Sequence, residues 1–168
     1  MSAKAAATTF TPKALLPEEL PLAELDIART ATEGEGPGGP WAVSRGAMPM
    51  NGRRFDAGLG LRAGTEVEFD LKGLFDTFSA AVGVDDAGPE SKKGDGLEFA
   101  VVGDGRLLWA SGLVQKADPA KRFEISLAGV RTLVLKVASR GGGGGWRRLQ
   151  GDWANAKLGR AVALPAAK

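Results

Sequence analysis

The sequence contains no cysteine and no histidine in its 168 residues. Without cysteine, the chain has no disulfide framework, no thiolate nucleophile and no cysteine-ligated zinc. Without histidine, it lacks the commonest general base, the commonest transition-metal ligand and every Ser-His or Cys-His arrangement. These two absences together exclude much of enzyme chemistry.

Concentrated positive charge and long apolar runs are also missing. The net charge of +2 is the difference between 22 basic and 20 acidic residues, and the basic residues occur as short scattered pairs. Nucleic-acid binding usually needs a basic face, so we expect no nucleic-acid partner. No stretch approaches the length of a membrane span, and the start "MSAKAAATTF" lacks the apolar segment of a secretory signal. We expect no membrane partner, and either a cytoplasmic protein or a chain whose leader has been removed.

What the sequence does contain is a repeated two-residue alternation of apolar and polar side chains. In "TEVEFDL", Thr65, Val67, Phe69 and Leu71 face one way and the three acidic residues face the other. This period is the signature of a strand with one solvated face. The same period recurs in "FSAAVGV", "LEFAVV", "RFEISL" and "RTLVLKVA".

Glycine-containing turns separate these runs. "GDG" lies between "LEFAVV" and "RLLWAS" and predicts a β-hairpin, and "AGV" between "RFEISL" and "RTLVLKVA" predicts a second one. Since no helical period is evident, the fold class we predict is all-β, an antiparallel β-sandwich. By length it is one domain, at 20–162, with an N-terminal tail or linker at 1–19 and a C-terminal tail at 163–168.

Five stretches, in order and spacing, resemble the NPCBM family of carbohydrate-binding modules. They are "MPMNGRRFDAGLGLRAGTEVEFDLKG", "FDTFSAAVGVDD", "LEFAVVGDGRLLWASG", "AGVRTLVLKVA" and "GDWANAKL", and they cover roughly residues 20–160. The resemblance implies a galactose-binding-like jelly roll, glycan binding, and an extracellular or periplasmic location. It also implies that Gly58 and Gly60 are positions of close backbone packing.

The chain departs from the family pattern at two places. Where the family usually reads Gly-Thr-His-Ala, this chain reads "GLRAG", so Arg62 stands at the histidine position. The late "GDW" also lacks the residues that generally separate this Asp from the Trp. Both departures bear on ligand contacts and leave the predicted fold unchanged.

Asp85 and Asp86 follow a predicted strand and precede a Gly-Pro turn. Adjacent strand residues point to opposite faces, so the two carboxylates cannot act as an acid and base on one substrate. One interpretation is that they accept backbone hydrogen bonds in a turn. The other is a structural calcium ion, which needs six to eight oxygens and which related jelly rolls often hold. Asp85, Asp86, Asp95 or Asp152 could supply part of that shell. We predict that the protein requires no cofactor for its function.

The four tryptophans occur in different contexts. Trp109 lies within a predicted strand and Trp153 follows the family-like Asp152, so we expect both to be buried. Trp41 opens a segment after a loop, and its role stays open. Trp146 lies between five glycines and the pair Arg147 and Arg148.

Trp146 is therefore either an aromatic platform for a sugar or a lid over the edge of the core. We name Trp146, Arg147, Arg148, Arg62 and Trp41 as candidate ligand-binding residues. The arginines could bind acidic sugars or sulfate as well as neutral hydroxyls, or serve solubility alone.

The resemblance implies a non-catalytic carbohydrate-binding module that recognises galactose-type or related glycans through loops at one end of the sandwich. Its partners would be a glycan and, in the same polypeptide, a bacterial glycoside hydrolase domain. The alternative is a protein-interaction or structural β-sandwich that has lost sugar binding. An enzyme is the weakest reading, because Glu66 and Glu68, the acid pair on one strand face, are more simply its solvated side.

Overall fold

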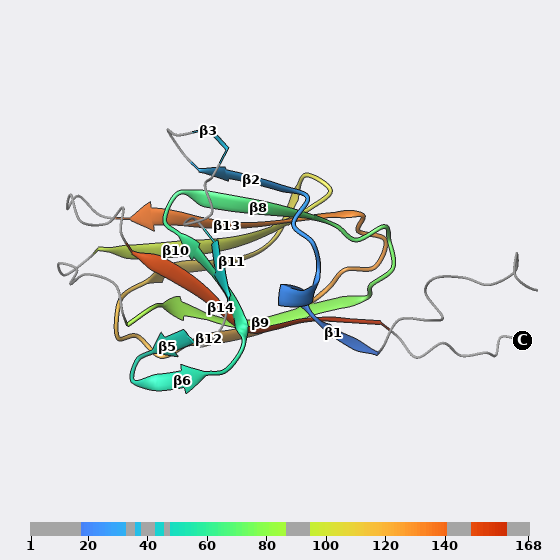
Figure 1. The fold of residues 1–168 in the computed structure, drawn as a ribbon. Coiled ribbons are helices and arrows are strands. Elements are labelled where there is room, and N and C mark those ends of the chain that lie inside the picture. Colours follow the sequence, from blue (N-terminus) through green and yellow to red (C-terminus); the bar gives the residue numbers. More distant parts are fainter. Residues whose placement is uncertain are drawn as a thin grey trace, which may run out of the picture.

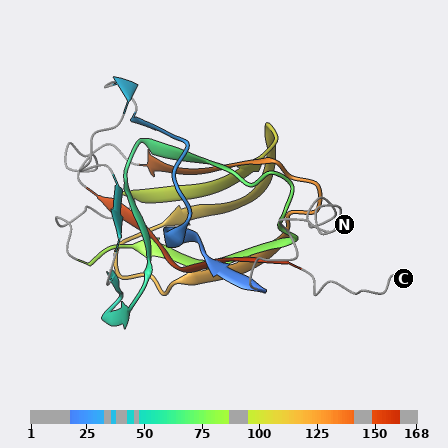
Figure 2. The same cartoon turned by 45° about the vertical axis from the view of Figure 1, so that its right-hand side comes forward.

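The computed structural model describes residues 18–32, 36–37, 43–45, 48–86, 95–140 and 149–160. These residues form two six-stranded antiparallel sheets that face each other, together with a short third sheet of two strands (Figures 1 and 2). The predicted all-β sandwich is confirmed. No helix among the described residues has the length and apolar character needed to span a membrane.

The first sheet has the strand order β12-β9-β14-β7-β4, with β1 also paired to β14. Its strands are β1 (Glu19–Pro21), β4 (Val43–Arg45), β7 (Gly58–Arg62), β9 (Thr77–Val84), β12 (Lys121–Ser126) and β14 (Gln150–Gly159). The second sheet has the order β11-β10-β13-β8-β2-β3. Its strands are β2 (Arg29–Thr32), β3 (Gly36–Pro37), β8 (Thr65–Asp70), β10 (Gly96–Gly103), β11 (Arg106–Val114) and β13 (Thr132–Arg140). The short sheet pairs β5 (Met48–Met50) with β6 (Arg53–Phe55), and η1 (Leu22–Glu24) is a single 3₁₀ turn.

The alternating pattern of the sequence places apolar side chains between the two sheets. On β8, Val67 and Phe69 are buried, whereas Glu66 and Glu68 lie on the outer face. There Arg29 forms ion pairs with both glutamates, at 3.9 and 3.6 Å. This agrees with the prediction that the acid pair is the solvated side of a strand.

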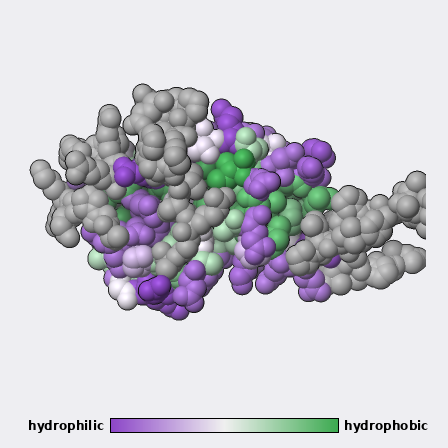
Figure 3. All heavy atoms as spheres, viewed as in Figure 1, coloured by the Kyte–Doolittle hydropathy of each residue, from purple (hydrophilic) through white to green (hydrophobic). Residues whose placement is uncertain are grey.

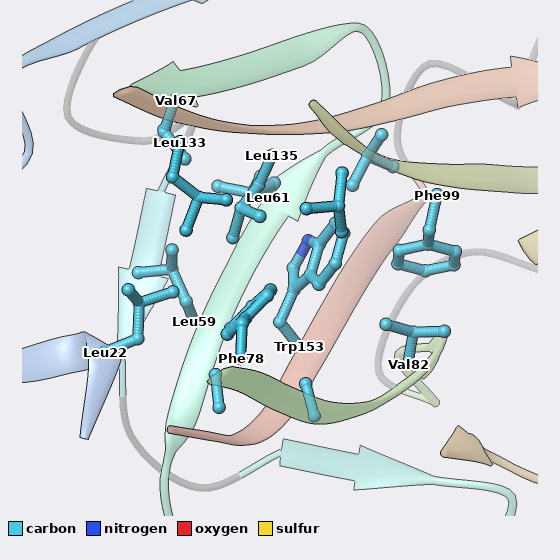
Figure 4. Packing of buried hydrophobic residues seen from close by; sticks show 14 of the residues in the cluster. Leu22, Leu59, Leu61, Val67, Phe78, Val82, Phe99, Leu133, Leu135 and Trp153 are labelled. Carbon is cyan, nitrogen blue, oxygen red and sulfur yellow. The ribbon is translucent and has the colours of Figure 1, made fainter. Parts of the chain in front are cut away.

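Trp153 lies at the centre of the core and is fully buried, as the sequence predicts (Figure 4). Its ring centroid is 6.3 Å from that of Phe78, 5.4 Å from Phe99 and 6.2 Å from Phe123. Trp109 is only partly buried and stacks on Phe123 at 4.0 Å. Because Trp109 and Phe123 come from β11 and β12, this stack joins the two sheets along one edge of the sandwich.

One of the two predicted hairpins forms. Gly103 pairs with Arg106, and both turn residues, Asp104 and Gly105, have positive φ angles of 50° and 83°. This is the geometry that Asp-Gly turns favour between twisted strands. The Asp104 carboxylate also accepts hydrogen bonds from the backbone N–H groups of Arg131 and Thr132, which attaches the turn to the start of β13.

The second predicted hairpin, around residues 128–130, is wrong. β12 pairs with β9 in the first sheet, whereas β13 pairs with β10 and β8 in the second. The turn at Ala128–Val130 therefore carries the chain from one sheet to the other. The residues of the turn predict a reversal of direction, but they do not specify which strand becomes the neighbour.

A second apolar cluster lies on the outer face of the first sheet. The β5–β6 hairpin places Met48, Met50 and Phe55 over Ala81 of β9 and Ala154 of β14, all nearly inaccessible to solvent. Glycine allows this close approach, because a Cβ added at Gly58 would lie 2.5 Å from the carbonyl oxygen of Trp153. The expected close backbone packing at Gly58 is thus confirmed.

The two ends of the described domain lie side by side. Glu19 pairs with Gly159, and the Arg160 amide donates a hydrogen bond of 3.0 Å to the Glu18 carbonyl oxygen. In the same sheet, Gln150 at the other end of β14 pairs with Arg62. Both ends of the described domain are therefore a full strand length from Arg62, and β1 lies at the right of Figure 1.

Candidate functional site

Several strands of both sheets end or begin together at the left of Figure 1. Gln150 pairs with Arg62, Gly151 pairs with Val84, and Gly96 pairs with Arg140. We call this region the loop end and define it by Arg62, Asp85, Asp86, Asp95, Arg140 and Gln150, together with Asp152, which lies one step further along β14. The fold thus brings together polar residues that are up to 90 positions apart in sequence.

Asp85 and Asp152 meet at Gln150. The Gln150 Nε2 donates to Asp152 Oδ1 at 2.9 Å and to Asp85 Oδ2 at 3.3 Å. The strand period explains the arrangement, because Gln150 and Asp152 are two residues apart and share a face of β14. Asp85 directly follows β9, the strand beside β14, and its own N–H donates a 2.9 Å hydrogen bond to the Gln150 carbonyl oxygen.

The Asp152 side chain is completely buried even though it points away from the Trp153 core. Its partners on both neighbouring strands are glycines, Gly60 on β7 and Gly83 on β9, which leave room for the carboxyl group. Met50 of the β5–β6 hairpin lies over Gly83, where an added Cβ would be 2.7 Å from its Sδ. The hairpin therefore helps to close this side of the sheet to solvent.

Burial raises the pKa of Asp152 from 3.8 to about 9, the neighbouring side chains of Asp85 and Asp86 contribute to the rise, and the hydrogen bond from Gln150 acts in the opposite direction. The Oδ2 atom of Asp152 has no hydrogen-bond acceptor or donor among the described residues. Removing a carboxylate from water disfavours its charged form. At neutral pH Asp152 therefore carries a proton.

Asp86 is directed elsewhere. Its carboxylate accepts hydrogen bonds from the backbone N–H groups of Asn51 at 2.9 Å and Gly52 at 2.8 Å, and its own N–H donates to the Pro49 carbonyl oxygen at 2.7 Å. This is the turn role expected for such an aspartate, although the turn belongs to the β5–β6 hairpin and not to the residues that follow Asp86. The adjacent aspartates thus perform two separate tasks.

These contacts bear on the predicted calcium ion. The carboxylates of Asp85 and Asp152 converge on an amide nitrogen, and Asp86 is occupied by backbone N–H groups. In the part of the chain that the structure describes, no three acidic side chains gather where they could hold a metal ion. This donor set alone does not fit calcium, which takes six to eight oxygens. A calcium site at Asp85, Asp86 and Asp152 stays a prediction.

The predicted ligand-binding residues divide into two groups. Arg62 is partly exposed at the loop end, beside Gln150 in the strand register. Trp41, Trp146, Arg147 and Arg148 lie outside the described residues. Their described neighbours in the chain, Val43, Arg140 and Leu149, all belong to strands or connections at this same end.

Two contacts at the loop end were not predicted from the sequence. Gln150 was not named as a site residue, and only its position two residues before Asp152 could have indicated it. The other is the ion pair between Arg140 and Glu98, Nη1 to Oε2 at 2.7 Å. Cross-strand pairs of this kind depend on register, which the sequence alone does not give.

The fold and its polar end define a jelly-roll β-sandwich of the type seen in carbohydrate-binding modules. Residues 19–159 match the model of the NPCBM/NEW2 domain, and the chain belongs to this family. A curated relative, "Putative endo-alpha-N-acetylgalactosaminidase" from Renibacterium salmoninarum, is 31% identical over 111 residues. The match covers 66% of this chain but only 7% of that relative.

Solved structures agree with the family assignment. A CBM51 module from a Clostridium perfringens GH95 protein, in complex with methyl-galactose, is 27% identical with a TM-score of 0.67, covering 83% of this chain and 99% of that module. The tandem CBM51 modules of a family 98 glycoside hydrolase from Streptococcus pneumoniae are 16% identical with a TM-score of 0.71, covering 87% of this chain and 48% of that one. At that identity the second likeness concerns the fold alone.

Proposed function

We propose that this domain is a non-catalytic carbohydrate-binding module that recognises galactose-type or related glycans at the loop end. The observation that carries the proposal is the match to nearly the whole of a CBM51 module that is in complex with methyl-galactose. Membership of the NPCBM/NEW2 family supports the same reading. The absence of cysteine and histidine from the sequence is in keeping with binding without catalysis.

The chemistry of the loop end suits a sugar. Hydroxyl groups need both donors and acceptors, and this end offers the Arg62 guanidinium as a donor and the Gln150 amide oxygen as an acceptor within one strand register. Ligand sites of this kind combine a few such polar groups with an apolar or aromatic surface. We assign that surface to Trp146, with Arg147 and Arg148 beside it in the sequence.

The domain would act as part of a longer enzyme. Its curated relative is about fourteen times longer than the matched segment, and its structural neighbours include modules of glycoside hydrolases. A single module binding in the millimolar range contributes about 4 kcal/mol. Linkage to a catalytic domain or to further modules would supply the avidity that one weak site lacks.

A binding experiment on the purified full chain tests the proposal. We expect a glycan array to show binding to galactose-bearing glycans, and calorimetry with methyl-galactoside to give a dissociation constant that rises at least about tenfold in Arg62→Ala and Trp146→Ala, as loss of a charged or stacking contact predicts. The matched control is Arg54→Ala, an exposed arginine on the β5–β6 hairpin. A folded protein that binds no glycan on the array contradicts the proposal and supports the protein-interaction alternative.

No cofactor is required by this function, and calcium enters it only as a candidate structural ion. If calcium binds at the loop end, its ligand shell must include oxygens besides those of Asp85 and Asp152. The array is therefore run with calcium and again with chelator. Sensitivity of glycan binding to chelator would establish the ion, and equal binding would assign the aspartates to hydrogen bonding alone.

A further inference from the structure

A hollow lies between the β5–β6 hairpin and the beginning of β12. Its volume is about 180 Å³. It is lined by Met50, Asn51, Arg53, Phe55, Pro119, Ala120 and Arg122. Met50 and Phe55 belong to the apolar cluster on the outer face of the first sheet, so this hollow opens on that face and not between the two sheets. Figure 1 shows the hairpin below that sheet.

The walls of the hollow are fixed by contacts that do not involve a ligand. Met50 and Phe55 are buried in the second apolar cluster, and Ala120 packs against that cluster. The turn that carries Asn51 is held by the Asp86 carboxylate. At the start of β12, Lys121 donates from Nζ to the Ser111 carbonyl oxygen at 2.8 Å. A preformed hollow loses little conformational entropy when it binds a ligand.

Two arginines and no acidic residue line this hollow. The Arg53 guanidinium carbon lies 5.3 Å from the centre of the Phe55 ring, and neither Arg53 nor Arg122 forms an ion pair with any residue that the structure describes. Asp86 binds the hairpin amides, and Glu124 shares with Arg122 the lining of an adjoining hollow without forming an ion pair with it.

Two like charges that share a small concave surface repel each other, and an anion placed between them converts this repulsion into attraction. Guanidinium groups bind carboxylate and sulfate through paired, parallel N–H···O bonds. Exposed Pro119 lines the same hollow and offers an apolar surface beside the two arginines. Figure 3 shows hydrophilic surface around this lower part of the molecule.

We propose that the hollow between Arg53 and Arg122 binds the anionic group of an acidic saccharide, a carboxylate or a sulfate ester, as a second site separate from the loop end. The anionic part of this inference rests on the charge and shape of the hollow. The saccharide part rests on the proposed function.

The test is a titration of the ¹⁵N-labelled full chain, followed by NMR, with three probes: sodium glucuronate, sodium sulfate and neutral methyl-galactoside. We expect at least one anion to shift the side-chain Nε signals of Arg53 and Arg122, more weakly as NaCl is raised. Arg53→Gln and Arg122→Gln should each weaken this binding by about tenfold, the loss expected for a charge-assisted contact. Arg54→Gln is the matched control, because Arg54 is exposed on the same hairpin but does not line the hollow.

The outcomes separate this inference from the proposed function. A response to glucuronate, to sulfate or to both, lost in the two variants and kept in Arg54→Gln, supports the site and identifies its anion. An equal loss in Arg54→Gln would show general surface charge and overturn the inference. Methyl-galactoside binding without any anion response overturns the inference and leaves the proposed function standing, and silence of all three probes contradicts both.

Discussion

Replacing Asp152 by Asn should flatten the dependence of folding stability on pH. In the folded chain Asp152 keeps its proton up to a pKa of about 9, whereas the unfolded chain releases it near pH 4. Asn is a close steric match for the protonated carboxyl group. Its carbonyl oxygen can accept from Gln150 Nε2, as Asp152 Oδ1 does.

The sign and size of the effect follow from proton linkage. Because the folded-state pKa is raised, the stability that the proton contributes is fully present below about pH 4 and is lost as the pH rises towards 9. Within that window the slope contributed by one such group is at most about 1.4 kcal/mol per pH unit. Between pH 5 and pH 7, Asp152 should therefore remove up to about 3 kcal/mol of stability that the Asn variant retains.

Urea denaturation at intervals from pH 4 to pH 9 measures this difference. We expect the two proteins to have similar stabilities near pH 4 and the Asn variant to be the more stable at pH 7. Asp56→Asn serves as the control, since Asp56 is exposed and does not contribute to the pKa of Asp152, so it measures the general effect of removing one carboxylate. Parallel pH profiles for wild type and Asp152→Asn would refute the reasoning and show that Asp152 is charged when folded.

Three further outcomes are expected. In urea denaturation, Trp153→Ala should lower the free energy of unfolding by roughly 3–5 kcal/mol, as large-to-small core changes do. Trp146→Ala should change it by no more than about 0.5 kcal/mol, and equal losses in the two variants would contradict the role of Trp146 as a platform. Asp86→Ala should lower the free energy of unfolding by about 1–2 kcal/mol and speed hydrogen exchange at the amides of Asn51 and Gly52. Unchanged exchange there would show that the Asp86 carboxylate does not hold this turn. Chelator should leave the thermal midpoint unchanged to within about 1 °C, whereas a fall of several degrees, which corresponds to about 1 kcal/mol or more, would establish a structural calcium ion.

The strands of the sandwich were predictable because their pattern is local. The alternation of Val67, Glu68 and Phe69 shows which side of β8 is solvated, without any knowledge of the neighbouring strands. The partner of β12 was not predictable, since the turn at Ala128–Val130 can lead equally to the same sheet or to the opposite one. The burial of Ala81 and Ala154 was also missed, because alternation assigns one face of each strand to solvent and the β5–β6 hairpin covers that face.

The candidate site was predictable as a list of residues and not as an arrangement. The family resemblance names Arg62 and Asp152, and the turn chemistry of aspartate anticipates the hydrogen bonds of Asp86. The meeting of Asp85 and Asp152 at Gln150 depends on the register between β9 and β14 and on glycines in the adjoining strands. Neither of these can be read from one stretch of sequence.

The position of the two ends of the described domain, Glu18 and Arg160, has a mechanical consequence. β1 and β14 are antiparallel, and Glu18 and Arg160 leave the sheet at the same place. A pull applied between these two residues would open the pairs from Glu19–Gly159 inward one at a time, which resists little force. A pull between the loop end and either Glu18 or Arg160 instead acts along the length of the strands and loads many hydrogen bonds at once. If the loop end holds a glycan, the domain transmits tension along its stronger axis.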